Sequence, residues 1–346
     1  MPIEAAARRD TAFFPEITHG GDLAAARLRF PDAPEPWVDL STGINPRPYP
    51  LAAVELPSTA WTRLPEPAQN ARLHAVAAGA YGLADAGCIV AASGTQPLLR
   101  ILPHILPARR VAILGFGYQE HPACWRAAGA DVRIVETVKE LHAPDIDVAV
   151  VINPNNPDGR LTPAGVLAEL AGRLAARGGR LVVDEAFMEV VRPSQSLVPS
   201  LPQGAIVLRS FGKAYGLAGV RLSFAIADAP TIEELRHRLG PWPVSGPALA
   251  VGTQALADRQ WLDEAVARLE EDAARLDRYL AGAGLQVRGG TPLFRLAVTP
   301  QAAMWVERLG RAGIHVRAFT QHPEWLRFGL PGPAEEWGRL ERALAR

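Results

Sequence analysis

Seven short apolar runs, rich in valine, isoleucine, leucine and alanine, recur between residues 88 and 227. Most are separated by stretches long enough for a helix, such as residues 162–178, where apolar positions recur at helical spacing. Runs that are apolar throughout and alternate with helices are typical of a largely parallel sheet covered by helices on both faces. We therefore predict seven strands, at residues 88–92, 109–115, 131–136, 147–153, 180–186, 205–211 and 222–227.

The segments on either side of these runs follow a different pattern. The first 60 residues are rich in proline and turn residues, with one short strand-like run at 37–41. A helix with regular spacing follows and should end near Gly82, because glycine terminates helices readily. Past Pro243 the chain reads as mainly helical, with a long amphipathic stretch at 261–284.

The chain closes with three more strand-like runs, at 294–298, 314–319 and 325–330. These runs and the helices before them predict a second, smaller α+β domain. The predicted division is an N-terminal arm with part of the small domain at 1–47, a large domain at 48–240 and the small domain at 241–346.

Composition narrows the class of protein. The 346 residues hold 36 lysines plus arginines and 36 aspartates plus glutamates, so there is no basic excess of the kind that nucleic-acid binders show. Cys88 and Cys124 are too few for a disulfide framework or a cysteine metal site, which favours a reducing compartment. The charged N-terminus does not resemble a signal peptide, and no apolar run could cross a bilayer. We expect a cytoplasmic protein without metal, membrane or nucleic-acid partner.

Polar residues follow four of the predicted strands, at the carboxyl ends where open parallel sheets bind ligands. A small-residue turn at 93–96 opens a helix and is either a helix cap or a phosphate site. A proline- and asparagine-rich turn would aim Asn156 outward, and Asp184 ends a buried run where a carboxylate needs a cation. Lys213 follows the sixth strand.

Lys213 has three interpretations: a solvated loop charge, a phosphate clamp or a nucleophile. The order of a nucleotide-binding phosphate loop is missing around it, which disfavours the second. Lysine forms Schiff bases, and an aspartate is the usual partner of the ring nitrogen of pyridoxal phosphate. With three other strand-end signals at the same edge, we favour a Schiff base with a charged aromatic cofactor.

The motifs SGTQ, GYQEH, NNPDG, DEAF, SFGKAYGLAGVR and LRFGL, in this order, resemble the fold-type I pyridoxal-phosphate enzymes of the aspartate aminotransferase superfamily. The resemblance implies pyridoxal 5'-phosphate as cofactor and Lys213 as its covalent anchor. It implies that Asp184 faces the ring nitrogen, supported by His121, that Asn156 faces the ring oxygen and that Tyr118 stacks on the ring. The residues it implies for the cofactor phosphate are Ser93, Gly94, Thr95, Ser210 and Arg221.

The stretches HGGD at 19–22, DLSTGINP at 39–46 and PWPVS at 241–245 are similar to the threonine-phosphate decarboxylases of cobalamin biosynthesis. This closer resemblance implies decarboxylation of O-phospho-L-threonine to aminopropanol phosphate. The alternative is an aminotransferase acting on histidinol phosphate or a related phosphorylated amino acid. The substrate contacts implied are His19, Gly20, Gly43, Asn45, Asn156, Arg317 and Arg327, with Arg327 at the family's carboxylate position.

Three positions depart from these patterns. Leu64 stands where many superfamily members have a tyrosine that reaches the neighbouring subunit's cofactor phosphate, although the resemblance still implies a homodimer. Phe187 replaces a tyrosine common in aminotransferases, which fits the decarboxylase pattern. Gly43 replaces a substrate-binding asparagine of the decarboxylases.

Overall fold

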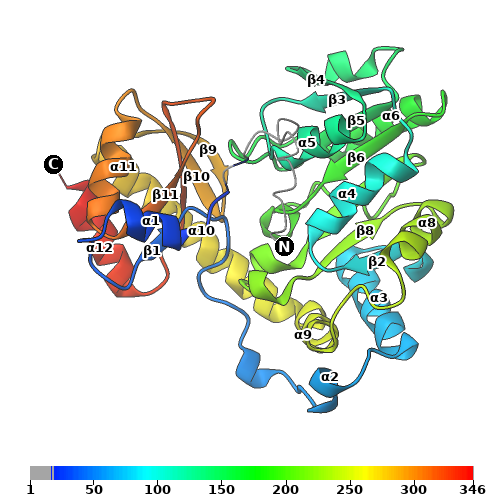
Figure 1. Cartoon of the computed structure of the whole chain (residues 1–346), viewed down its shortest axis with the longest axis horizontal. Coiled ribbons are helices and arrows are strands. Elements are labelled where there is room, and N and C mark those ends of the chain that lie inside the picture. The colour runs from blue at the N-terminus through cyan, green and yellow to red at the C-terminus, as the bar shows by residue number, and fades with distance from the viewer. Residues whose placement is uncertain (1–16, 18, 346) are drawn as a thin grey trace, which may run out of the picture.

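The structure, a computed structural model, describes residue 17 and residues 19–345. The described chain forms two bodies, each built on its own sheet (Figure 1). The larger body, cyan to green in Figure 1, contains the strands of the chain's middle part, and the smaller contains the blue N-terminal and the orange to red C-terminal elements.

The larger sheet consists of the seven predicted strands, which confirms both their number and their places. Its spatial order is β2-β8-β7-β6-β5-β3-β4, and only β8 runs antiparallel to its neighbours. The strands are β2 Ile89–Ala92, β3 Arg110–Leu114, β4 Asp131–Val135, β5 Val148–Ile152, β6 Arg180–Asp184, β7 Ala205–Ser210 and β8 Ser223–Ile226.

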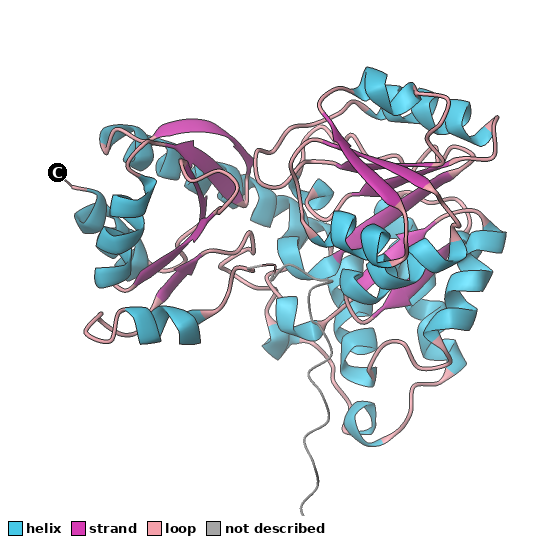
Figure 2. Cartoon of the chain, turned by 45° about the horizontal axis from the view of Figure 1, so that its top comes forward, coloured by secondary structure: helices cyan, strands magenta, loops and turns pink. Residues whose placement is uncertain are grey.

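Helices cover both faces of this sheet, as continuous apolar strands require (Figure 2). Successive side chains of a strand point to opposite faces, so that Val182 and Val183 of β6 belong to two different apolar clusters. One cluster includes side chains of α4 Thr95–Ile105, α5 Glu120–Ala127 and α8 Ala229–Leu239, and the other includes α3 Pro67–Tyr81, α6 Ala164–Ala175 and α9 Gly246–Ala257.

The smaller sheet has the order β1-β11-β12-β10-β9. The N-terminal strand β1 Val38–Leu40 pairs in parallel with β11 Ile314–Ala318, so the two ends of the chain build this sheet together. Its other strands are β9 Gln286–Thr291, β10 Phe294–Val298 and β12 Trp325–Gly329, and its helices are α10 Arg259–Gly282, α11 Ala302–Arg311 and α12 Ala334–Leu344.

Some elements were not predicted. Strand β9 contains two adjacent glycines, which weaken a strand signal in the sequence, yet it pairs with β10. Helix α1 Leu23–Arg29 follows Asp22, whose carboxylate accepts a bond from Ala25 N at 2.9 Å and caps the helix. The remaining short helices are α2 Thr59–Thr62, α7 Phe211–Ala214, η1 Leu51–Ala53, η2 Ala86–Cys88, η3 Val138–His142, η4 Met188–Val190 and η5 Ala218–Val220.

The domain boundaries at residues 47 and 240 stay a prediction. Among the described residues, no helix is both long enough and apolar enough to span a membrane, and no histidine, cysteine and carboxylate groups gather as they would around a metal ion. The cytoplasmic location also stays a prediction.

Candidate active site

A cavity of about 870 Å³ lies at the carboxyl edge of the larger sheet, with strand β11, its following loop and Arg327 of the smaller sheet in its wall. The loops after β3, β5, β6 and β7 all contribute to it. Arg221 also reaches it, because β8 runs antiparallel and therefore begins at the edge where its neighbours end. The polar residues that follow these strands in the sequence thus line one cavity.

Lys213 lies on the short helix α7, directly after β7, and lines the cavity. Its carbonyl accepts a bond from Asn45 N at 2.9 Å, which fixes the backbone beneath the side chain. The ammonium nitrogen lies 5.8 Å from the centre of the Phe187 ring, and no carboxylate of the described residues forms an ion pair with it. Burial, with the charges of Arg327 and Arg221, lowers the pKa of Lys213 to about 8, against the opposing effect of Asp184.

Asp184 ends β6 as a buried carboxylate. One of its oxygens lies 2.8 Å from His121 Nε2, and the other accepts a bond from Ala186 N at 3.1 Å. The predicted support of Asp184 by His121 is therefore confirmed as a contact. A carboxylate held in this way is costly to bury unless a cationic group completes its surroundings, and its side chain lines the cavity.

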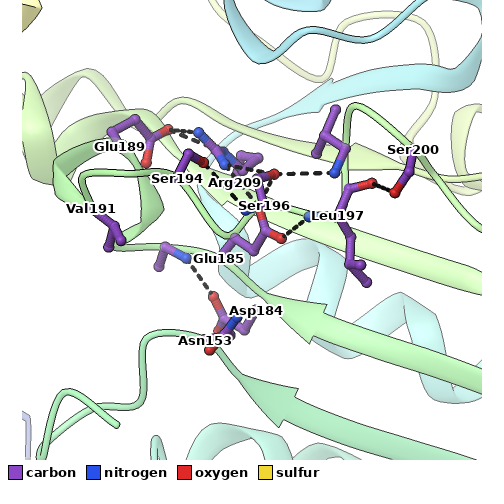
Figure 3. Close-up of polar contacts among 12 residues, drawn as sticks. Asn153, Asp184, Glu185, Glu189, Val191, Ser194, Ser196, Leu197, Ser200 and Arg209 are labelled. Carbon is purple, nitrogen blue, oxygen red and sulfur yellow. Dashed lines mark hydrogen bonds and ion pairs between the residues drawn. The ribbon is translucent and has the colours of Figure 1, made fainter. Parts of the chain in front are cut away.

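A buried ionic cluster also holds the end of β6, on the side of the strand opposite the Asp184 side chain (Figure 3). Glu185, the next residue, accepts a bond at 2.8 Å from the guanidinium of Arg209, which is the residue before Ser210 on β7. Arg209 also pairs with Glu189 at 3.3 Å, and all three side chains are buried. This ionic cluster joins β6 to β7 directly behind Asp184 and Ser210, and so holds the two strand ends in register.

The turn after β5 is fixed by its own asparagines. The Asn153 amide donates to Thr162 O and accepts from Thr162 N, while the Asn155 amide donates to Phe116 O at 2.9 Å. Asn156 is therefore turned into the cavity, where its Oδ1 accepts a bond from Arg327 Nη1. The prediction that this turn aims Asn156 outward from the strand end agrees with this placement.

Arg317 and Arg327 are direct neighbours on the antiparallel strands β11 and β12, and both line the cavity. Arg327 donates from Nη2 to Ser41 O at 2.7 Å, while its buried Nε has no hydrogen-bond partner among the described residues. Burial and the charge of Arg317 lower the pKa of Arg327 to about 10. Two adjacent guanidinium groups at one end of a cavity favour an anionic ligand there.

The turn before α4 lies against Arg221. Gly94 adopts a φ of +86°, and a Cβ at this position would lie 2.3 Å from Arg221 Nη2, so the close approach requires glycine. Thr95 Oγ1 lies 3.0 Å from Ser223 Oγ, and both residues line the cavity together with Ser210. Hydroxyls, a helix N-terminus and an arginine form a suitable site for a phosphate.

Most predicted site residues lie in the wall of this cavity, but three do not. Ser93 is exposed and donates to Pro243 O, and Gly94 lies beneath Arg221. Asn45 is buried and donates from Nδ2 to Ala214 O at 2.9 Å. The residues that line the cavity are His19, Gly20, Gly43, Thr95, Tyr118, Asn156, Asp184, Ser210, Lys213, Arg221, Arg317 and Arg327.

Gly43 has no room for the asparagine of the decarboxylase pattern. A Cβ there would lie 2.9 Å from Phe294 and 3.0 Å from Phe187. These two rings pack edge to face with centroids 5.0 Å apart, so an aromatic pair occupies the space that a side chain at residue 43 would need.

Sequence reasoning missed several polar residues of the cavity, among them Gln96 and Glu120. The Glu120 carboxylate is buried, lies 2.9 Å from His19 Nε2 and accepts a bond from Gln96 Nε2. Gln96 lies in the SGTQ motif and Glu120 in the GYQEH motif, but the family resemblance assigned roles only to other residues of these motifs. The position of Glu120 directly before His121, a residue with an implied role, is the signal in the sequence that could have pointed to it.

Comparison with known proteins identifies the family to which this chain belongs. A sequence model described as aminotransferase class I and II matches residues 61–344. A threonine-phosphate decarboxylase of Pseudomonas aeruginosa is 42% identical, covering 95% of this chain and 97% of its own length, and one of Sinorhizobium sp. is 44% identical, covering 95% and 98%. The solved structure of histidinol-phosphate aminotransferase from Sinorhizobium meliloti in complex with pyridoxal-5'-phosphate covers 98% of this chain and 97% of its own, with a TM-score of 0.81 and 23% identity.

Proposed function

The chain belongs to the aminotransferase class I and II family and is a pyridoxal 5'-phosphate-dependent enzyme, and from this premise we propose that it decarboxylates O-phospho-L-threonine. The product would be (R)-1-amino-2-propanol phosphate. The resemblance of its motifs to the decarboxylases of cobalamin biosynthesis supports a place in that pathway.

The pairing of Arg317 with Arg327 carries this proposal. O-phospho-L-threonine has a phosphate and a carboxylate, and two neighbouring guanidinium groups together with His19, all in the wall of the same cavity, can bind both anions. The names of the two relatives at 42% and 44% identity support the same substrate.

The residues present fit the cofactor. Lys213, Asp184 and Arg221 line one cavity without forming ion pairs with one another. A group with an aldehyde, a protonated ring nitrogen and a phosphate complements all three, and the close approach of Arg221 to Gly94 brings its guanidinium to the turn before α4, where a phosphate can bind. We therefore assign Lys213 to the aldehyde carbon, Asp184 to the ring nitrogen and Arg221, Thr95 and Ser210 to the phosphate, with Asn156 at the ring oxygen and Tyr118 on the ring face.

The protein's part in the reaction is binding, orientation and proton transfer. When bound, pyridoxal 5'-phosphate withdraws electrons from the substrate's α-carbon, so that a bond to that carbon can break and leave its electron pair behind. By anchoring both anionic groups of the substrate, the arginine pair and His19 would turn the carboxylate toward the position where its bond to the α-carbon is the one that breaks. Carbon dioxide then leaves, and Lys213 Nζ delivers the proton that replaces it.

The proposed reaction is tested by incubating the purified holoenzyme with O-phospho-L-threonine without any keto acid and identifying the amine formed. Aminopropanol phosphate supports the proposal. An enzyme that acts only when a keto acid is added, with histidinol phosphate as the preferred amino donor, is an aminotransferase and contradicts it.

Covalent attachment of the cofactor should depend on pH in a specific range. Lys213 must be neutral to attack, and because its pKa is lowered to about 8, the neutral amine becomes dominant above that pH. We expect the rate of attachment to cofactor-free protein to rise as pH increases through about 8 and then to level off. Stopped-flow absorbance measures this rate, and a rate still rising near pH 10, as for an ordinary lysine, contradicts the assignment.

Replacing Arg317 by alanine should weaken substrate binding but not cofactor binding. Arg317 lies on β11 of the smaller sheet, whereas the turn before α4, which is assigned to the cofactor phosphate, follows β2 of the larger sheet. Loss of one charged partner should raise the KM for O-phospho-L-threonine about tenfold or more. Steady-state kinetics and the absorbance of bound cofactor separate the two effects, and loss of the cofactor in this variant contradicts the assigned roles.

We propose that the enzyme is a homodimer. Three large apolar side chains from segments near α2 and before α9 are exposed: Trp61 at 69%, Leu64 at 65% and Trp242 at 55%. Apolar residues so exposed favour burial against a second copy. Light scattering of the holoenzyme should give twice the mass of the chain, and a monomer at micromolar concentration contradicts the proposal.

A further inference from the structure

Glu120, the first residue of α5, is a buried carboxylate in the wall of the cavity. Its two oxygens contact side chains from two other segments of the chain. Oε1 lies 2.9 Å from Nε2 of His19, in the segment before α1, and Oε2 accepts a bond from Nε2 of Gln96, the second residue of α4. Glu120 therefore connects the N-terminal segment with the helix assigned to the cofactor phosphate.

A carboxylate in this position works against the binding of anions unless its charge is balanced. Arg221 and Arg327 line the same cavity, and neither forms an ion pair with Glu120. The ring of His19, whose Nε2 lies 2.9 Å from Glu120 Oε1, is the group that can balance this charge when it is protonated. Glu120 therefore acts on the cavity through the position and the charge of the His19 ring.

The segment that contains His19 is attached on its other side to the smaller sheet. Gly21 N donates to Ser41 Oγ at 2.7 Å, and Ser41 O accepts from Arg327 Nη2 at 2.7 Å. The side chain of His19 is 48% exposed, and its ring centre lies 6.1 Å from that of Tyr118. A ring so exposed would rotate freely without its bond to Glu120, since backbone contacts alone do not fix a side chain.

We propose that Glu120 is a positioning residue for the substrate's phosphate, acting through His19. With Nε2 bonded to Glu120, Nδ1 stays available, and it forms no hydrogen bond to any other residue that the structure describes. A doubly protonated imidazole donates from both nitrogens, so Nδ1 donates to a phosphate oxygen while Glu120 balances part of the positive charge. This inference rests on the proposed function for its phosphorylated substrate.

The test compares Glu120→Gln, His19→Ala and the double variant as holoenzymes. The dissociation constant of O-phospho-L-threonine is read from the absorbance of the bound cofactor. We expect each single variant to raise it about tenfold. The double variant should bind no worse than about twofold more weakly than either single one, because both changes act on the same charged contact: Glu120→Gln removes its negative charge and His19→Ala removes the ring.

Two controls make the result specific. L-threonine lacks the phosphate, so its dissociation constant should be the same in Glu120→Gln and in the unmodified enzyme. Glu169→Gln removes an exposed ion pair with Arg173 on α6, away from the cavity, and should change neither constant.

Unchanged binding of O-phospho-L-threonine by Glu120→Gln overturns the inference, as does a double variant in which the two effects multiply. Equal weakening for both amino acids also overturns it, because the effect would not concern the phosphate. These outcomes are separate from failure of the proposed function, since binding is measured whether carbon dioxide or an amino group is released afterwards.

Discussion

Lys213→Ala eliminates both covalent attachment of the cofactor and turnover, with a loss of activity of more than about a thousandfold. Lys213 is the amine in the cavity, it is held by the Asn45 contact to its carbonyl, and its lowered pKa gives it a larger neutral fraction near neutral pH than an ordinary lysine has. The same nitrogen supplies the proton in the proposed reaction, so its removal affects two steps. The absorbance of protein-bound cofactor and the rate of product formation measure the two effects.

The sequence provides a matched control, because it contains only two lysines, Lys139 and Lys213. Lys139 lies exposed in the short helix η3, so Lys139→Ala should leave the absorbance and the rate unchanged. Borohydride reduction of the holoenzyme followed by peptide mass spectrometry should find the cofactor's mass on Lys213. A label on Lys139, or retained activity in Lys213→Ala, contradicts the assignment.

Asp184→Asn should lower kcat by about a hundredfold or more while the protein stays folded. The amide has the shape of the carboxylate and can keep a contact with His121 and with Ala186 N. It lacks the negative charge that, in the proposed role, keeps the ring nitrogen of the cofactor protonated, so the electron-withdrawing power of the bound cofactor should fall. Single-turnover kinetics with saturating cofactor measure the effect on the chemical step.

The control for this variant is Asp263→Asn, which removes an exposed partner of Arg192 and should leave kcat unchanged. A loss of kcat in Asp184→Asn that disappears at high cofactor concentration would mean that Asp184 serves binding alone. That outcome contradicts the proposed electronic role.

The larger sheet could be predicted from the sequence because its signals are local. Each strand is a short apolar run between turn residues, and a parallel sheet places the carboxyl ends of such runs at one edge. Asn156, Asp184 and Lys213 each follow such a run directly, and the structure brings all three to one cavity.

Contacts between distant segments could not be predicted in this way. His19 and Glu120 are 101 residues apart, and neither sequence neighbourhood indicates the other. Asn45 is a different case: a motif suggested a substrate contact, which stays a prediction, while the structure shows that its amide donates to Ala214 O. The site assignments drawn from the family resemblance therefore stay proposals until variants are measured.

The most direct test of the central claim follows the carboxyl carbon of the substrate. The holoenzyme is incubated with O-phospho-L-threonine labelled at the carboxyl carbon, without a keto acid, and labelled carbon dioxide and aminopropanol phosphate are quantified. We predict that both form continuously and in equal amounts. Label that remains in the amino acid, with an amino group transferred once a keto acid is added, would contradict the account.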